Sequence, residues 1–144
     1  MPEATSMAID EEGWLHSGDI CLRTPDGYYK VTGRLKDMII RGGENLYPRE
    51  IEEFYLTNPK VRDVQVVGVP DEKYGEECRA WIILYKGETA DEAEMRAYGN
   101  ASIARHKVPR YFLFVDEFPM NAAGKILKYK MREESVRLLG LDNK

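Results

Sequence analysis

The run from Cys78 to Tyr85 is the feature of this sequence that most restricts its fold. Its isoleucine and aromatic side chains favour β-structure, so the run predicts a central strand. A second strand is predicted just before it by three spaced valines, Val64, Val66 and Val69. Pro70 is expected to end that strand, because proline cannot donate a hydrogen bond to a neighbouring strand. Residues 111–115 predict a third strand.

Helices are expected between and after these strands. Pro48 suits a first helical position, since the N–H that it lacks would be unpaired there, and Asn58-Pro59 is expected to end this helix. Thr89 and Glu92 have the spacing of a capping box and predict a second helix that ends before Pro109. After the N-terminal segment, the expected order is therefore helix, strand, strand, helix, strand and helix, with no internal repeat.

A last helix is predicted from about Lys128, with Gly140 as its C-terminal cap. Its apolar face is expected to carry Leu127, Met131 and Leu138. From residue 37 onward the chain therefore predicts a compact α+β domain, in which helices cover one small sheet.

The first 33 residues are not predicted to belong to this α+β domain. The first dozen are polar and are expected to form an extended lead-in. Two short apolar runs then flank Pro25-Asp26-Gly27, and this turn sequence predicts a β-hairpin, with glycine taking the positive φ. The segment is too short to form a core alone, so we expect it to be the edge of something larger.

Composition excludes several classes of protein. With 144 residues, 43% hydrophobic and 32% charged, the chain is expected to be globular rather than disordered. Two cysteines, Cys21 and Cys78, cannot form a disulfide framework, so we expect a reducing, cytoplasmic location. The longest apolar run is far too short to span a bilayer. The N-terminus is acidic and lacks the features of a signal peptide.

Charge is distributed unevenly along the chain. The formal net charge is −4, yet residues 105–132 hold seven Lys or Arg residues against two acidic residues. This excess indicates an anionic partner or, alternatively, a solvated basic face. Nucleic acid is not the expected partner, because the chain as a whole is acidic.

Two glycine-containing loops are candidate sites. Gly42 and Gly43 allow close approach of a ligand to the backbone, although a tight loop would explain them equally well. The loop before Ile126 presents Lys125, which by itself is an ordinary surface lysine. His16 and His106 lie far apart in the sequence and have no cluster of ligands around them, so no metal site is expected.

Five motifs recur in one order along the chain. They are residues 13–19 (Gly-Trp-Leu-His-Ser-Gly-Asp), 33–37 (Gly-Arg-Leu-Lys-Asp), 42–45 (Gly-Gly-Glu-Asn), Pro48 with Ile51-Glu52, and 124–126 (Gly-Lys-Ile). Together they resemble the C-terminal end of the adenylate-forming acyl-CoA synthetases, or AMP-binding enzymes. The resemblance extends from about residue 2 to residue 139 and is greatest to the fatty acyl-CoA synthetases.

The resemblance implies specific roles in ATP chemistry. Asp19 would bind the ribose hydroxyls of ATP or of the acyl-adenylate, and Arg34 would contact the same ribose and the phosphate. Lys36 would be the hinge residue. Lys125 would be the catalytic lysine of adenylation, bridging the attacking carboxylate and the α-phosphate. Mg²⁺ is expected to come with ATP, with no metal ligands in this chain.

The resemblance also implies a site for coenzyme A (CoA). The channel for its pantetheine arm would be lined by Gly42, Gly43, Glu44 and Tyr74. Candidates for binding the CoA phosphates are Arg105, Lys107 and Arg110. In this scheme a carboxylic acid, most simply a fatty acid, reacts with ATP, the small domain rotates, and the thiol of CoA then attacks.

The implied domain organisation is incomplete. Residues 1–36 would be the tail end of a large N-terminal domain plus the hinge, and residues 37–144 the small C-terminal lid domain. Because the large domain is missing, we expect these 144 residues to be inactive alone. One departure from the family pattern lies in the lysine loop, where Asn121-Ala122-Ala123 replaces a stretch that carries threonine near its start in many relatives.

Two alternatives remain at this point. One is the lid of an adenylating enzyme of the same fold whose acceptor is a carrier-protein thiol, although the basic cluster at residues 105–110 favours a free CoA phosphate. It is also compatible with a stand-alone binding module that stacks RNA bases on Tyr111 and Phe112, although these lie in an apolar strand and core packing explains them better.

Overall fold

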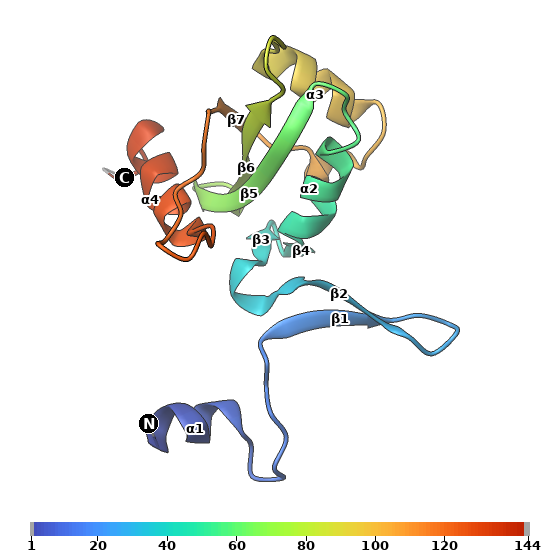
Figure 1. Cartoon of the computed structure of the whole chain (residues 1–144), viewed down its shortest axis with the longest axis vertical. Helices are drawn as coiled ribbons and strands as arrows, with labels where there is room; N and C mark the ends of the chain where they lie inside the picture. The colour runs from blue at the N-terminus through green and yellow to red at the C-terminus, as the bar shows by residue number, and fades with distance from the viewer. Residues whose placement is uncertain (1, 143–144) are drawn as a thin grey trace. The chain divides into compact units, whose positions relative to one another are not determined.

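The computed structural model describes residues 2–142 (Figure 1). It divides the chain into two compact units, residues 1–36 and residues 37–144. Among the described residues, no helix is long and apolar enough to cross a membrane.

The first unit is a helix followed by a hairpin. Strands β1 (Asp19–Arg23) and β2 (Tyr29–Arg34) pair antiparallel, and Gly27 in the turn has φ of 90°, so the predicted hairpin is confirmed. The predicted extended lead-in is wrong, because residues 2–8 form helix α1 (Pro2–Ala8). Proline in the first turn, followed by glutamate and alanine, favours a helix even where the segment is polar.

No residue between positions 2 and 36 is buried within this unit. Large apolar side chains stand exposed along it: Met7, Trp14, Leu15, Leu22, Tyr28, Tyr29 and Leu35. A segment of this length cannot build an apolar core by itself, as the sequence indicated.

The second unit is built on one mixed sheet. Strand β6 (Gly75–Leu84) is central, which confirms the prediction. Strand β5 (Val61–Asp71) pairs antiparallel along one edge of β6, and β7 (Tyr111–Phe114) pairs parallel along the other. At the beginning of β6, Gly75 pairs with Arg41 of β3 (Ile39–Arg41), which continues into β4 (Glu44–Leu46).

One strand prediction needs correction, and one loop is defined more closely. Pro70 does not end β5, which continues to Asp71 with Pro70 opposite Glu76. An edge strand tolerates proline, because the N–H on its open side has no strand to meet. The expected tight loop is present: Gly42 and Gly43 have φ of 58° and 85° and form the two-residue turn between β3 and β4, which the sequence did not predict as a strand. Positive φ at both positions is what such a hairpin turn requires.

The helices follow the predictions with shifted boundaries. Helix α2 (Pro48–Tyr55) has Pro48 in its first turn, as predicted. Helix α3 (Glu92–Asn100) begins after Asp91 rather than Thr89, since the Asp91 carboxylate accepts the N–H of Glu94 and caps the helix directly. It ends earlier than predicted, after Gly99-Asn100, which are poor helix formers. A short 3₁₀ turn, η2 (Arg105–Lys107), follows.

Helix α4 (Lys128–Leu138) confirms the last prediction in part. Met131 is buried and Gly140 follows the helix with φ of 66°, as expected of a C-terminal cap. Leu138 is exposed, whereas Ser135 is fully buried, with its hydroxyl accepting the Trp81 indole N–H at 2.9 Å. Helical spacing selects a face, but the strands beneath decide how far along that face the core extends.

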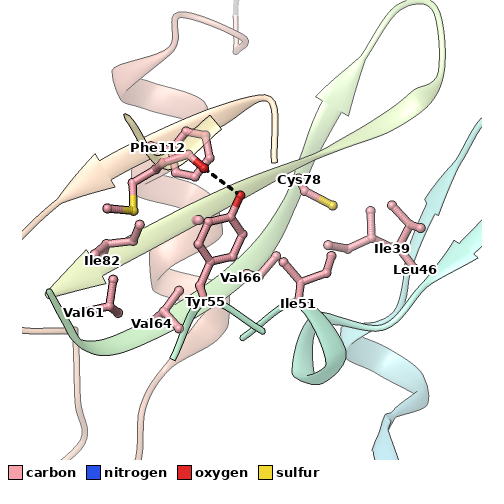
Figure 2. Packing of buried hydrophobic residues seen from close by; sticks show 12 residues of the cluster. Ile39, Leu46, Ile51, Tyr55, Val61, Val64, Val66, Cys78, Ile82 and Phe112 are labelled. Carbon is pink, nitrogen blue, oxygen red and sulfur yellow. Dashed lines mark hydrogen bonds between the residues drawn. The ribbon is translucent and has the colours of Figure 1, made fainter. Parts of the chain in front are cut away.

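The two faces of the sheet have separate cores. Helices α2 and α3 cover one face, where Tyr55, Ile82 and Phe112 pack in the cluster that Figure 2 shows. Helix α4 covers the other face and buries Trp81, Phe118 and Met131. Figure 1 shows α4 on the opposite side of the sheet from α2 and α3. Alternate side chains of β6 supply both cores, as strand geometry requires.

Candidate functional site

Lys125 lies on a tight turn between β7 and α4. The backbone N–H of Asn121 donates to the carbonyl of Lys125 at 2.9 Å, and the N–H of Gly124 donates back to Asn121 at 3.0 Å. Gly124 has φ of 79°, which allows the chain to reverse. The Lys125 side chain is exposed, and among residues 2–142 it forms no ion pair or side-chain hydrogen bond. Its charge is therefore available to an anionic ligand.

The Asn121 side chain holds this turn together. Its carbonyl oxygen Oδ1 accepts the backbone N–H groups of Ala123 and Lys125, each at 3.0 Å. In the family pattern, Asn121 stands out only as a departure from the usual threonine. The signal for its role was present nevertheless, because asparagine three residues before glycine is a common turn sequence.

The base of the turn is fixed to the domain. The N–H of Leu127 donates to the carbonyl of Pro119 at 2.9 Å, and Met120 forms a β-bridge with Ile126. Lys128, at the start of α4, then pairs with Glu52 of α2 at 2.7 Å. The turn thus projects from a rigid base, and its only cationic side chain is that of Lys125.

The Gly42-Gly43 turn is held by Tyr74. The N–H of Gly42 donates to the Tyr74 carbonyl at 2.8 Å, and a Cβ at Gly42 would lie 3.2 Å from the Tyr74 ring. The Arg41 guanidinium lies 3.9 Å from the centre of the same ring and pairs with the buried Glu77 at 2.9 Å. The structure therefore brings together Gly42, Gly43 and Tyr74, three of the four residues predicted for the channel.

Two neighbouring cations affect the pKa of the Tyr74 phenol. Lys73 contributes most to lowering the pKa of Tyr74, with Arg41 adding to it. Sequence reasoning missed Arg41 and Glu77, because nothing local in the sequence indicates that a residue of β3 pairs with one of β6.

Glu44, the fourth predicted channel residue, follows this turn. Its carboxylate lies 2.8 Å from Nε2 of His106 in η2. The next residue, Lys107, pairs with Glu50 of α2 at 2.8 Å. These two contacts fasten η2 to the region where β4 and α2 begin.

The predicted cluster of basic CoA-binding residues is largely neutralised within the domain. Lys107 pairs with Glu50, and Arg110 lies 2.9 Å from Asp71. Farther along the basic stretch, Lys128 pairs with Glu52 and Arg132 with Glu76. Of the seven basic residues, three form no ion pair with the described part of the chain: Arg105, Lys125 and Lys130. The sequence excess of positive charge thus largely reflects ion pairs with residues distant in sequence.

Asp19 and Arg34 lie opposite each other in the first unit. They are paired residues of the β1–β2 hairpin, and Arg34 Nε lies 3.6 Å from Asp19 Oδ1. Both side chains are accessible, so the hairpin presents a carboxylate beside a guanidinium. Lys36 lies in the short 3₁₀ turn η1 (Leu35–Asp37) and is the last residue of the first unit. Lys125 belongs to the second unit.

The alternative of an RNA-stacking strand finds no support in this arrangement. Phe112 is buried in the core beside Tyr55, and its ring is not exposed for stacking. Tyr111 is partly exposed and lies beside Arg110, which is itself paired with Asp71.

Among the described residues, no group of three or more His, Cys, Asp or Glu side chains is arranged to hold a metal ion.

The fold of residues 37–142, with a lysine-bearing turn before its last helix and a diglycine turn between its first strands, is that of the small domain of adenylate-forming enzymes. Residues 50–125 match the family model described as the AMP-binding enzyme C-terminal domain, and the chain belongs to this family. The resemblance inferred from the motifs and the predicted α+β fold are both confirmed.

Named relatives support the acyl-CoA synthetase branch. YngI of Bacillus subtilis (strain 168), whose name assigns it provisionally to the acyl-CoA synthetases, is 55% identical over 141 residues, covering 98% of this chain and 26% of YngI. The mitochondrial medium-chain acyl-CoA ligase ACSF2 of Macaca fascicularis is 48% identical over 140 residues, covering 97% of this chain and 23% of ACSF2.

A solved structure shows the same architecture. The crystal structure of ATP-bound MatB from Rhodopseudomonas palustris matches with a TM-score of 0.86 and 36% identity, covering 93% of this chain and 27% of MatB. The chain therefore spans about a quarter of the length of the proteins it matches.

Proposed function

We propose that this chain is the C-terminal part of an ATP-dependent acyl-CoA synthetase that makes an acyl-adenylate and then acyl-CoA. The observation that carries the proposal is an accessible lysine that has no acidic partner among residues 2–142 and is held on a rigid turn in a domain of the adenylate-forming family. A fatty acid is the proposed substrate class, supported by the relative named as a medium-chain ligase. The two free cysteines are in keeping with a reducing, cytoplasmic location.

In the first half-reaction, a carboxylate oxygen of the acid attacks the α-phosphorus of ATP, and pyrophosphate leaves. Negative charge accumulates between the carboxylate and the phosphate, where the Lys125 ammonium stabilises it without transferring a proton. Asp19 accepts hydrogen bonds from the ribose hydroxyls, and Arg34 contacts the ribose and the phosphate. Mg²⁺ enters as part of the ATP substrate.

In the second half-reaction, the thiol sulfur of CoA attacks the acyl carbon, AMP leaves and the thiol proton is lost. The Gly42-Gly43 turn, with Glu44 and Tyr74, lines the channel for the pantetheine arm. Glycine there lets the arm pass close to the backbone, and the hydrogen bond from Gly42 to Tyr74 keeps the turn in shape. Lys36 is the hinge about which the small domain moves between the two half-reactions.

Of the three basic residues proposed for the CoA phosphates, Arg105 is the best candidate. Lys107 and Arg110 already have carboxylate partners, and binding a phosphate would have to compete with Glu50 and Asp71. Reversing the charge with Arg105→Glu is expected to raise the KM for CoA in the complete enzyme. Arg62→Glu, an exposed arginine of the same domain, is the control. An unchanged KM for CoA would favour a carrier-protein thiol as the acceptor.

The experiment that tests the proposal separates the half-reactions. In the complete enzyme, Lys125→Ala is expected to abolish ATP–pyrophosphate exchange and to leave the conversion of preformed acyl-adenylate to acyl-CoA largely intact. Lys130→Ala, which removes another accessible lysine, is the matched control and should retain both. If Lys125→Ala retained full exchange activity, the proposed role of Lys125 would be wrong.

Two further expectations concern the large N-terminal domain that the family resemblance implies. The 144 residues alone are expected to catalyse no ATP–pyrophosphate exchange, and detectable exchange by the purified chain would contradict this. The open reading frame upstream of residue 1 is expected to encode a large domain with a Ser/Thr/Gly-rich phosphate loop. A stop codon immediately upstream would instead favour a stand-alone binding module.

A further inference from the structure

We propose that Asn121 is a positioning residue for adenylation: its side-chain carbonyl fixes the turn that aims Lys125 at the reacting phosphate. This inference rests on the proposed function, in which Lys125 acts on the α-phosphate. It assigns to Asn121 a task that the family resemblance did not supply, since threonine is more usual near this position.

Asn121 is the centre of the turn's hydrogen bonds. Its Oδ1 accepts the N–H groups of Ala123 and Lys125 at 3.0 Å each. Its backbone N–H donates to the Lys125 carbonyl at 2.9 Å, and its own carbonyl accepts the Gly124 N–H at 3.0 Å. Lys125 is therefore bound to Asn121 through both its N–H and its carbonyl, which fixes the direction in which its side chain leaves the backbone.

No neighbouring side chain can substitute for this carboxamide. Residues 122–124 are Ala, Ala and Gly, so Asn121 is the only residue of the turn before Lys125 with a polar side chain. Glycine at 124 adds freedom, because without the carboxamide its backbone can adopt other conformations. The Asn121 side chain thus supplies the order that the sequence of the turn otherwise lacks.

The turn is exposed, and this separates positioning from folding. Without Asn121 Oδ1, the N–H groups of Ala123 and Lys125 can bond to water, so the domain loses little stability. The base of the turn remains fixed, through Leu127 and Pro119 and through the Lys128–Glu52 pair. What changes is the fraction of time that the Lys125 ammonium spends in the productive position.

The test compares three variants in two sets of measurements, one on the 144-residue chain and one on the complete enzyme. In the 144-residue chain, amide hydrogen exchange of Ala123 and Lys125 and the Tm are measured for Asn121→Ala, Asn121→Thr and the control Asn100→Ala, an exposed asparagine at the end of α3. In the complete enzyme, kcat and KM are measured separately for the adenylation and thioester-forming half-reactions. Threonine retains a hydroxyl that accepts similar hydrogen bonds more weakly.

Asn121→Ala is expected to accelerate exchange at Ala123 and Lys125 without lowering the Tm, and to reduce the adenylation kcat by about ten- to a hundredfold, as misplacement of a reacting group does. The KM for ATP and the thioester-forming step should be unchanged. Asn121→Thr should recover part of the loss, and Asn100→Ala should match the wild type.

Equal adenylation kcat for Asn121→Ala and the wild type would overturn the inference, as would Asn121→Thr performing no better than Asn121→Ala. A loss of both half-reactions together with a lower Tm would also overturn it, because a structural role would then explain the effect. Lys125→Ala distinguishes failure of the inference from failure of the proposed function. If that variant retains adenylation, the function is wrong; if it is inactive and Asn121→Ala is fully active, only the inference fails.

Discussion

The Glu52 carboxylate and the Lys128 ammonium, 2.7 Å apart, together close the outer edge of β5 at Val66. Glu52 Oε1 accepts the Val66 N–H at 2.9 Å, and Lys128 Nζ donates to the Val66 carbonyl at 3.1 Å. The pair therefore satisfies the two backbone groups of Val66 that a neighbouring strand would otherwise bond, and it blocks pairing with another chain at this edge. It also ties the start of α4, directly after the Lys125 turn, to α2.

Breaking this pair is expected to destabilise the domain. Lys128→Ala leaves the Val66 carbonyl without its donor and the Glu52 carboxylate without its cation, and both groups are partly shielded from water, so the free energy of unfolding should fall by about 2 kcal/mol. Urea unfolding followed by Trp81 fluorescence in a Trp14→Phe background measures this. Arg137→Ala, which breaks an exposed pair with Glu134 on the same helix, should have no measurable effect. An equal effect of the two variants would contradict the role assigned to Lys128.

The diglycine turn offers a test of its contact with Tyr74. Gly42→Ala should cost about 1 kcal/mol for the positive φ and about 1 kcal/mol more for the 3.2 Å approach of its Cβ to the ring. Gly87→Ala, with φ of 86° and open space around its Cβ, should show the first cost alone. Urea unfolding of both variants measures the difference. If Gly42→Ala is no less stable than Gly87→Ala, the Tyr74 contact does not constrain the turn.

Asp71 makes stability depend on pH in the acid range. The N–H of Tyr74 contributes most to lowering the pKa of the Asp71 carboxyl, with the N–H of Lys73 and the Arg110 guanidinium acting in the same direction. A carboxyl with a depressed folded-state pKa stabilises the protein above its unfolded pKa, about 3.9, and that stability is lost as the pH falls through the folded value.

Asp71→Asn should therefore lower the Tm at pH 7 and should reduce the loss of Tm between pH 6 and pH 3. Asp116→Asn, at an exposed position of the same domain, should follow the wild-type pH profile. Thermal scans across this range measure both. An Asp71→Asn profile parallel to that of the wild type would show that Asp71 does not carry this pH dependence.

The two cysteines should differ sharply in reactivity. Burial in the core raises the pKa of Cys78 to about 12, whereas Cys21 is exposed on β1. Because the thiolate is the reacting form, an Ellman assay of the native chain at pH 8 should detect one fast thiol, and a second only after unfolding in urea. In Cys21→Ser the fast thiol should disappear. Rapid native labelling of Cys78 would show that the core opens more readily than its packing indicates.

Local signals in the sequence were sufficient for most of the elements, although helix α1 was missed. The apolar run at residues 78–85 gave the central strand, Pro48 the start of α2, and the turn at residues 25–27 the hairpin. The errors lie where a tertiary contact or a competing cap decided the boundary. Pro70 is tolerated because β5 is an edge strand, and Asp91 caps α3 because its carboxylate is one residue from the helix. Leu138 has the right spacing for the core and is exposed nonetheless.

For the candidate site too, the sequence predicted some features and the tertiary structure decided others. The order of the motifs identified the family, because a family is encoded in residue types and spacing, whereas the role of Lys125 stays a prediction. The sequence also determined that the chain has a positive stretch, but the structure decided that most of this charge is neutralised. Lys107, Arg110, Lys128 and Arg132 pair with carboxylates from α2 and the β5–β6 region.

The sequence by itself determined the β1–β2 hairpin, the main helices and strands of the second unit, the turns that require glycine, and the membership of the family, since all of these depend on residue types and their local spacing. Only the tertiary structure decided which charges remain free and which backbone edge is closed. Coulombic pairs and side-chain hydrogen bonds act over a few ångströms in space, and folding brings Glu52 and Lys128, or Arg41 and Glu77, to that distance from far apart in the sequence.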